Sequence, residues 1–439
     1  MPFPFLNGYA ADAPVVCHGA QSIDRARFEA RVAALRATLP AARHIINLCD
    51  NRYAFLTTFA AALAERRVTL LPPDAGDAAL LDLCRRYDSV VVVSDRSLPP
   101  LPVLVYRWND VNEPSMSGAG MVPITDDQAA VVVHTSGSTG TPRPHVKSWG
   151  ALVRRARTVG ARLGLAESGI GKIVSTVPSQ HMYGIENAIM LPLQHGLPVD
   201  GGRPLFPADV AAALDETTLL VTTPIHLRSL TVGGPVGAHP RLILSSTAPL
   251  SAEQAREAEE HLGAPVMEIY GSTETGVVAT RRTSSTAEWR LLDSLRLRDD
   301  ERGQMQLHDV ETGAVSDLHD SIELRGGDRF VLGARAQDIV KVAGKRTSLA
   351  ALTESLCAIQ GVEDGAFLAP RKQDEAAARL VALVVAPTVS EAEIAAGLRA
   401  RIDPVFMPRP LVKVESLPRN ATGKLPWSAL QGFWDRMAG

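Results

Sequence analysis

The sequence of 439 residues has few cysteines and no long apolar run. The four cysteines, at positions 17, 49, 84 and 357, are far apart and form no C-x-x-C pair. This spacing argues against a disulfide framework and a zinc site, and it predicts reduced thiols in a cytosolic protein. No apolar run reaches the roughly 18 residues of a membrane span. The N-terminal Met-Pro-Phe-Pro-Phe-Leu lacks the basic region and apolar segment of a signal peptide.

The chain also lacks an excess of charge of either sign. Charged residues make up 21% of the sequence, apolar residues 46%, and the formal net charge is −3. A nucleic-acid-binding protein normally carries a basic stripe, so this balance argues against a nucleic-acid partner. The length allows two or three domains with a large core. We therefore expect a soluble, multidomain globular chain, with neither a membrane nor a nucleic acid among its partners.

Strand-like and helix-like segments alternate along most of the chain, which favours an α/β layered fold. Helices are expected near residues 23–39, 51–66, 77–86 and 252–262, and strands at 44–48, 68–71, 90–93, 172–177, 219–222, 241–245 and 265–269. From about residue 302, short strands with glycine turns predict a small β-rich part. The last hundred residues predict a separate α+β unit, with helices near 348–359 and 390–400 and strands near 366–369 and 380–385. A domain boundary near residue 335 follows.

The most informative segment comes directly after the apolar run of residues 129–133. It consists of His134, Thr135, Ser136, Gly137, Ser138, Thr139 and Gly140, with Arg143 behind it. Glycines let a backbone fold tightly around a ligand, while N–H groups and hydroxyls donate to anionic oxygens. The segment therefore predicts either a phosphate-binding loop or a solvated surface turn. It is not a P-loop, because Thr-Pro rather than Lys-Ser follows Gly140.

Four further segments bear on this loop, and each has an ordinary alternative. Glu274 follows a predicted strand, where a carboxylate either binds Mg²⁺ or a hydroxyl, or is simply a charged turn residue. His181 either faces a ligand or is a partly buried histidine whose hydrogen bonds are made within the protein. The polar segment 332–346 is a functional boundary or a linker with solvated charges. Lys424, after Gly423, is functional or an ordinary surface lysine.

Together and in this order, the five motifs resemble those of the adenylate-forming superfamily. That superfamily contains acyl- and aryl-CoA ligases, carrier-protein ligases and peptide-synthetase adenylation domains. The resemblance covers roughly residues 20–430. It implies layered α/β sheets with a small β-rich subdomain in residues 1–334, which bind ATP and the acid. It also implies a mobile α+β lid domain in residues 335–439 that carries Lys424, with the active site between the two domains.

The resemblance also implies roles for individual residues. Glu274 matches the Mg²⁺-associated acid and Thr273 a phosphate-contacting hydroxyl, while Lys424 matches the lysine that contacts the carboxylate and the α-phosphate. Asp320 and Arg335 match the pair that binds the ribose hydroxyls. The hinge between the domains would be Gln337 or Asp338.

The remaining matches are segments around the nucleotide. The loop Thr135, Ser136, Gly137, Ser138, Thr139 and Gly140, with Arg143, matches the part that holds the ATP phosphates. Ser246, Thr247, Ala248 and Pro249 match the segment along the adenine and the acid pocket, and Tyr270, Gly271 and Ser272 lead to the acid at 274. The chain departs from the family pattern at Arg143, where lysine is usual, and at Leu318-His319, where Thr-Gly usually precedes the ribose aspartate.

The acid substrate is suggested by the segment around His181, which matches the position bordering the ring of the acid in aryl-acid ligases. The other expected acid-binding residues are Tyr183, Ile185, Ile225, Ser246 and Thr247. Residues 181–184 and 146–149 look most like aryl-acid ligases of bacterial xanthomonadin and aryl-polyene pigment pathways, which load hydroxybenzoate onto an acyl carrier protein.

The resemblance thus implies a cytoplasmic enzyme that uses ATP and Mg²⁺ to activate 3- or 4-hydroxybenzoate as an acyl-adenylate. The acceptor would be the phosphopantetheine thiol of an acyl carrier protein. The alternative is an aryl- or medium-chain acyl-CoA ligase. A second alternative is a non-catalytic nucleotide-binding protein on the same fold.

Overall fold

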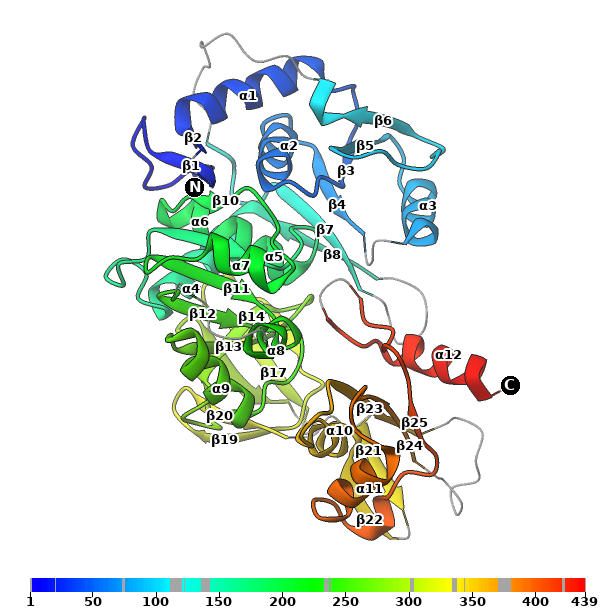
Figure 1. The fold of residues 1–439 in the computed structure, drawn as a ribbon. Helices are drawn as coiled ribbons and strands as arrows, with labels where there is room; N and C mark the ends of the chain where they lie inside the picture. The colour runs from blue at the N-terminus through cyan, green and yellow to red at the C-terminus, as the bar shows by residue number, and fades with distance from the viewer. Residues whose placement is uncertain are drawn as a thin grey trace. The chain divides into compact units, whose positions relative to one another are not determined.

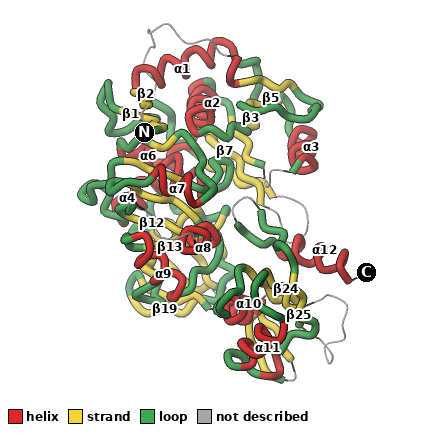
Figure 2. Tube along the Cα trace, in the orientation of Figure 1, coloured by secondary structure: helices red, strands yellow, loops and turns green. Residues whose placement is uncertain are grey.

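The computed structural model describes residues 2–19, 21–72, 76–110, 121, 123–135, 143–232, 237, 239–300, 304–333, 338–342, 344–369, 380–420 and 423–438. The chain divides into two compact units, Met1–Leu295 with Ala421–Gly423 and Arg296–Asn420 with Lys424–Gly439. Figures 1 and 2 show the elements of both units. These two units are defined by their compactness and not by how they move. The predicted lid boundary between residues 334 and 335 therefore stays a prediction.

One sheet of the first unit has the strand order β6-β5-β3-β4-β7-β8. Its strands are β3 (His44–Asn47), β4 (Val68–Leu71), β5 (Val90–Ser94), β6 (Leu104–Arg107), β7 (Ala129–Thr135) and β8 (Arg143–Ser148). All neighbours are parallel except β7 and β8. Strand β5 is buried along its whole length, as a parallel strand covered on both faces requires. The helices that alternate with these strands are α1 (Arg25–Thr38), α2 (Arg52–Ala64) and α3 (Asp77–Arg86), and the short η1 (Trp108–Asp110) follows β6.

A second sheet runs, within the first unit, in the order β15-β14-β13-β12-β11-β9-β10-β1-β2. Its strands are β1 (Pro14–His18), β2 (Gln21–Asp24), β9 (Lys172–Ser175), β10 (Val199–Asp200), β11 (Thr218–Thr222), β12 (Leu242–Ser245), β13 (Val266–Ser272), β14 (Gly276–Arg282) and β15 (Trp289–Leu291). Neighbours from β1 through β13 are parallel, whereas β2, β14 and β15 pair antiparallel.

The helices of this part are α4 (Trp149–Arg162), α5 (Met182–Gly184), the π-helix η2 (Ile185–Met190), α6 (Leu191–His195), α7 (Pro207–Ala213), α8 (Pro224–Val232) and α9 (Ala252–Leu262). Helices α8 and α9 bury apolar side chains such as Leu227 and Leu262 in one core with Leu220 and Ile243 of the sheet. Helix α9 starts where the Ser251 hydroxyl accepts the N–H of residue 254 and ends at a left-handed glycine, so its sequence specifies both ends.

The second unit begins with short strands: β16 (Leu295–Asp299), β17 (Met305–Asp309), β18 (Val315–Asp317), β19 (Ile322–Gly326), β20 (Arg329–Leu332), β21 (Ile339–Val342) and β22 (Lys345–Ser348). It continues with α10 (Leu349–Cys357), β23 (Asp364–Leu368), β24 (Val381–Val385), α11 (Glu391–Arg399), η4 (Pro404–Phe406), β25 (Leu411–Lys413) and α12 (Trp427–Ala438). Strand β24 alternates its side chains between two cores: Ala382 and Val384 pack in one, Leu383 and Val385 in the other.

The predicted mixed α/β class is confirmed, as are the short strands after residue 302 and the α+β end of the chain. Strand β4 and helices α3 and α9 have the bounds that the sequence predicts. Within the described residues, no helix is both long enough and apolar enough to cross a membrane.

Candidate active site

The strands β9, β11, β12 and β13 pair in parallel, so their carboxyl ends lie side by side at one edge of the second sheet; Figure 1 labels β11, β12 and β13. Several predicted site residues follow these strand ends: Ile225 after β11, Ser246 and Thr247 after β12, and Glu274 after β13. In open α/β sheets, ligands bind beyond the carboxyl ends of the strands. This edge is therefore the candidate active site.

Glu274 lies in the three-residue turn between β13 and β14. The turn is closed by its own side chains, since the N–H of Ser272 donates to the Thr275 hydroxyl over 3.1 Å and the N–H of Thr275 donates to the Ser272 hydroxyl over 3.2 Å. The Glu274 side chain is 48% exposed. Partial desolvation raises the pKa of this carboxyl, but hydrogen bonds from its backbone and Ser272 and the charge on nearby basic groups outweigh that effect and lower the pKa. Glu274 is therefore an accessible carboxylate at neutral pH.

This carboxylate fits a Mg²⁺ ligand. Mg²⁺ prefers oxygen ligands and is commonly held by one or two carboxylates together with substrate phosphates and water. Among the described residues, no group of three or more histidine, cysteine, aspartate or glutamate side chains is arranged to hold a metal ion alone. A single ionised carboxylate suits an ion that arrives with a phosphate substrate.

Two basic side chains of β8 that the motif comparison did not place in the site lie against the Glu274 turn. Lys147 donates from Nζ to the backbone carbonyl of Glu274 over 2.5 Å, and His145 Nε2 lies 3.5 Å from its Oε1. A third group, Glu186 of the π-helix, is 6% exposed and interacts electrostatically with Lys147. The sequence offers one sign of Glu186, which is a carboxylate inside a mostly apolar segment. A buried charge needs partners, so such a residue points to neighbouring charges or donors.

The segment after β12 is held in a strained conformation. Thr247 has a φ of +84°, which a β-branched residue rarely adopts. The preceding hydroxyl, that of Ser246, donates to the carbonyl of Ile269 in β13 over 3.0 Å. Such strain persists where surrounding structure fixes it, often at a functional site. Ala248 and Pro249 follow directly, so all four residues predicted along the nucleotide occupy the sheet edge.

The predicted acid-binding residues differ in what they can offer a ligand. His181 caps helix α5, and its Nδ1 accepts the N–H of Tyr183 over 3.2 Å, so Nδ1 carries no proton. The Tyr183 hydroxyl is buried and donates to the carbonyl of Leu244 in β12 over 2.8 Å. Ile185 is fully buried. The side chains of Tyr183 and Ile185 are therefore buried, and direct contact with the acid stays a prediction.

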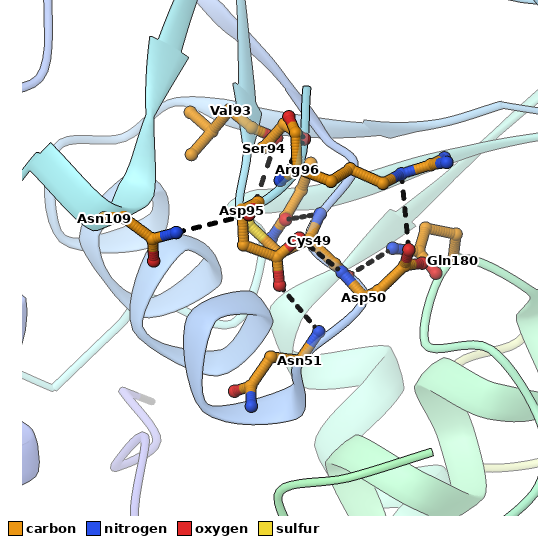
Figure 3. Close-up of polar contacts among 10 residues, drawn as sticks. Cys49, Asp50, Asn51, Val93, Ser94, Asp95, Arg96, Asn109 and Gln180 are labelled. Carbon is orange, nitrogen blue, oxygen red and sulfur yellow. Dashed lines mark hydrogen bonds and ion pairs between the residues drawn. The ribbon is translucent and has the colours of Figure 1, made fainter. Parts of the chain in front are cut away.

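Figure 3 shows how the residue before His181 is tied to the first sheet. Gln180 donates from Nε2 to the carbonyl of Cys49, just beyond β3, over 2.7 Å. The Asp95 carboxylate, beyond β5, accepts the N–H groups of Asp50 and Asn51 over 3.0 and 2.8 Å. These bonds join the ends of β3 and β5 and give the His181 segment a fixed attachment.

A histidine not singled out by the sequence also lies at the sheet edge. Nδ1 of His226, in helix α8, is 3.0 Å from the hydroxyls of both Thr176 and Thr223. Burial, with a smaller contribution from the charge of Arg203, lowers the pKa of His226 from 6.5 to about 4. The imidazole is therefore neutral at physiological pH.

His226 gives a pH-dependent prediction. Between pH 6.5 and about 4 the unfolded chain binds a proton at this position and the folded chain does not, so stability falls as the pH falls. His226→Asn keeps an acceptor for the threonines but does not titrate. We expect the variant to lose about 2 kcal/mol less than the wild type between pH 7 and pH 4.5. Urea denaturation at both pH values measures this, and equal losses would contradict the assignment.

Part of the predicted nucleotide site lies outside the described residues. Ser136, Gly137, Ser138, Thr139, Gly140, Arg335 and Gln337 are in this group. Thr135 ends β7 and Arg143 begins β8, and only their backbones are described. The two strands pair antiparallel, so the predicted phosphate loop connects a β-hairpin.

The described residues of the second unit include Asp320, Asp338 and Lys424. Asp320 precedes β19 and Asp338 precedes β21. The N–H of Lys424 donates to the Asn420 side chain over 2.9 Å, and the N–H of Asn420 donates to the carbonyl of Lys424 over 2.8 Å. The structure leaves the roles of all three as predictions.

Comparison with known proteins gives a family match over most of the chain. A family profile described as "AMP-binding enzyme" matches residues 8–313. A 4-coumarate–CoA ligase from Rhodobacter capsulatus is 30% identical over 280 residues, which are 63% of this chain and 68% of the relative. The 4-coumarate–CoA ligase of Cereibacter sphaeroides is 29% identical over 302 residues, 66% of this chain and 69% of the relative.

Solved structures share the fold at lower identity. ATP-bound MatB from Rhodopseudomonas palustris superimposes with a TM-score of 0.80 at 18% identity, covering 98% of each chain. The o-succinylbenzoate coenzyme A synthetase of Bacillus subtilis, in complex with ATP and magnesium, has a TM-score of 0.80 at 18% identity, covering 96% of this chain and 97% of that one. These likenesses establish the adenylating-enzyme fold.

Proposed function

Because the chain belongs to the family of AMP-binding enzymes, we propose that it activates an aromatic carboxylic acid with ATP and passes the acyl group to a thiol. It is an AMP-forming acid–thiol ligase that uses ATP and Mg²⁺. The observation that carries the site assignment is the position of Glu274. Its carboxylate is ionised and half-exposed, and it lies in the turn after β13, at the carboxyl edge of the sheet.

The reaction has two steps. The substrate carboxylate attacks the α-phosphorus of ATP, the bond to the β-phosphate oxygen breaks, and pyrophosphate leaves. A thiol then attacks the acyl carbon of the mixed anhydride, forming a thioester and releasing AMP. Two anions meet in the first step, so cations and N–H donors must offset their repulsion and the charge that develops.

Each proposed residue has one part in this chemistry. Glu274 would hold Mg²⁺, which offsets phosphate charge and improves pyrophosphate as a leaving group. Thr273 would contact a phosphate oxygen through its hydroxyl. Lys424 would place a point charge between the carboxylate and the α-phosphate. Asp320 and Arg335 would bind the ribose hydroxyls, and the loop 135–140 with Arg143 the phosphates.

We propose hydroxybenzoate, 3- or 4-substituted, as the acid. His181 would border its ring, with Ile225 and Thr247 on neighbouring strand ends. The bond from Tyr183 N–H to His181 Nδ1 supports this placement, because it fixes the orientation of the imidazole at the sheet edge. Relatives named for 4-coumarate, a phenolic acid, also favour an aromatic substrate.

The thiol acceptor has two candidates. The CoA-ligase relatives favour coenzyme A. A phosphopantetheinylated acyl carrier protein, as in xanthomonadin and aryl-polyene pigment synthesis, is the second candidate. Residues 336–439 contain 13 lysines and arginines against 11 aspartates and glutamates, a net charge of +2 that is compatible with an acidic carrier. Both acceptors present the same phosphopantetheine thiol.

We also propose that residues 335–439 move as a lid about Gln337 or Asp338 and bring Lys424 to the ATP for the first step. All four cysteines are free, which supports a cytoplasmic location as part of the proposal.

A panel of aromatic and aliphatic acids in an ATP–pyrophosphate exchange assay identifies the substrate. We expect hydroxybenzoates to support the fastest exchange, and a preference for aliphatic acids would overturn the proposed substrate class. The preferred acid is then incubated with ATP and either coenzyme A or holo acyl carrier protein. Thioester formed on only one acceptor decides between the two ligase types.

A further inference from the structure

The Glu274 turn is held from outside by side chains of two other elements. Lys147 reaches it from β8, a strand of the other sheet, and donates from Nζ to the carbonyl of Glu274 over 2.5 Å. Glu274 and Lys147 are 127 residues apart in the chain. The contact fixes the backbone at the tip of the turn, the point from which the Glu274 carboxylate projects.

The far side of the turn is held by Glu186. Its Oε1 accepts the N–H of Val277, the second residue of β14, over 3.4 Å. Gly276 makes this approach possible, because a Cβ at that position would lie 2.4 Å from the same oxygen. Its φ of +69° also favours glycine. The end of the turn is therefore built around the buried carboxylate.

Charge links the two supports. Glu186 is buried, and desolvation raises its pKa, an effect that the positive charges of Arg155 and Lys147 offset only in part. Lys147 in turn interacts electrostatically with Glu186 and Glu274. A buried carboxylate is costly, and removing a nearby cation leaves its charge less compensated. Glu186, Lys147 and Glu274 are thus electrostatically coupled at the proposed metal-binding turn.

We propose that Lys147 and Glu186 are positioning residues that set the location of the Glu274 carboxylate. The inference rests on the proposed function, in which Glu274 holds Mg²⁺. Neither side chain is assigned contact with substrate. Lys147 acts on the backbone of Glu274 and Glu186 on the backbone of Val277, so the loss of either changes where the carboxylate lies while leaving its chemistry intact.

Lys147→Met tests this directly, because methionine keeps the length of the stem and removes the donor. We expect kcat for acid-dependent exchange to fall about 10- to 100-fold, since displacing a catalytic group by about 1 Å has effects of that size. The Mg²⁺ concentration for half-maximal exchange rises at least fivefold, while KM for the acid changes less than twofold. Lys147→Arg, which retains a donor, recovers most of the Mg²⁺ affinity.

A second measurement needs neither ATP nor Mg²⁺. Hydrogen exchange followed by mass spectrometry is expected to show faster exchange in Lys147→Met confined to residues 272–277. Glu186→Gln, which keeps the size of the side chain but removes its charge, is expected to change hydrogen exchange in the same segment.

The matched control is Lys172→Met. Lys172, the first residue of β9, is also partly buried, and its Nζ forms an ion pair with Asp215 over 2.7 Å. If Lys147→Met matches Lys172→Met in Mg²⁺ requirement and in exchange of residues 272–277, the inference is overturned. If the wild type exchanges no pyrophosphate with any acid, the proposed function fails, and hydrogen exchange still tests whether Lys147 holds the turn.

Discussion

Replacing Lys424 by alanine is expected to slow acyl-adenylate formation by two to three orders of magnitude. The first step brings a carboxylate to a polyphosphate, and a lysine that contacts both offsets charge that grows in the transition state. The loss of one such contact costs about 3 kcal/mol, equivalent to roughly a hundredfold or more in rate. The second step starts from a formed adenylate and does not need this charge, so thioester formation from supplied acyl-adenylate is expected to change far less.

Lys413→Ala is the control, because Lys413 is an exposed lysine of the same compact unit that donates to the carbonyl of Val389. Pyrophosphate exchange measures the first step and thioester formation from synthetic acyl-adenylate the second. Equal losses in both steps for Lys424→Ala would refute its proposed role.

The largest effect on stability is expected at Arg52. Arg52 is the first residue of helix α2, next to the first sheet, and it is 1% exposed. The guanidinium donates to the carbonyls of Ser175 over 2.5 Å, Val177 over 3.0 Å and Asp200 over 3.4 Å, and to that of Gly202. All four acceptors belong to segments at the ends of β9 and β10. Arg52 therefore joins the two sheets through buried hydrogen bonds.

Arg52→Met is expected to lower the free energy of unfolding by about 3–5 kcal/mol, because several buried carbonyls lose a charged donor and nothing replaces it. Arg256→Met is the comparison: Arg256 is exposed on α9, and its replacement is expected to change stability by less than about 0.5 kcal/mol. Urea denaturation measures both. A loss at Arg52 as small as at Arg256 would show that the guanidinium does not hold the sheets together.

Local patterns predicted the fold well where an element's own sequence decides its limits. Helix α9 has a serine cap and a terminal glycine, and β4 is a short, mostly apolar run between Arg67 and Pro72, so the sequence predicts the bounds of both. The π-helix at Ile185–Met190 has no such marker and was missed, as was the amphipathic α12 at the end of the chain.

The site was predictable only where a motif stands in one segment. Glu274, Thr247 and His181 could be proposed because each stands in a short motif that resembles one of the adenylate-forming superfamily, and their roles stay predictions. Lys147 and Arg52 could not, because the acceptors of Arg52 lie at least 123 residues away and that of Lys147 lies 127 away. The strain at Thr247 likewise depends on neighbouring strands. Long-range hydrogen bonds leave no periodic pattern in a sequence.

The central claim is that this chain forms an acyl-adenylate from an acid and ATP. Acid-dependent exchange of labelled pyrophosphate into ATP by the wild-type protein tests that claim most directly. Exchange that requires Mg²⁺, is negligible without acid and appears with a hydroxybenzoate is the result expected. The absence of exchange with every acid of a broad aromatic and aliphatic panel would contradict it and favour a non-catalytic nucleotide-binding protein.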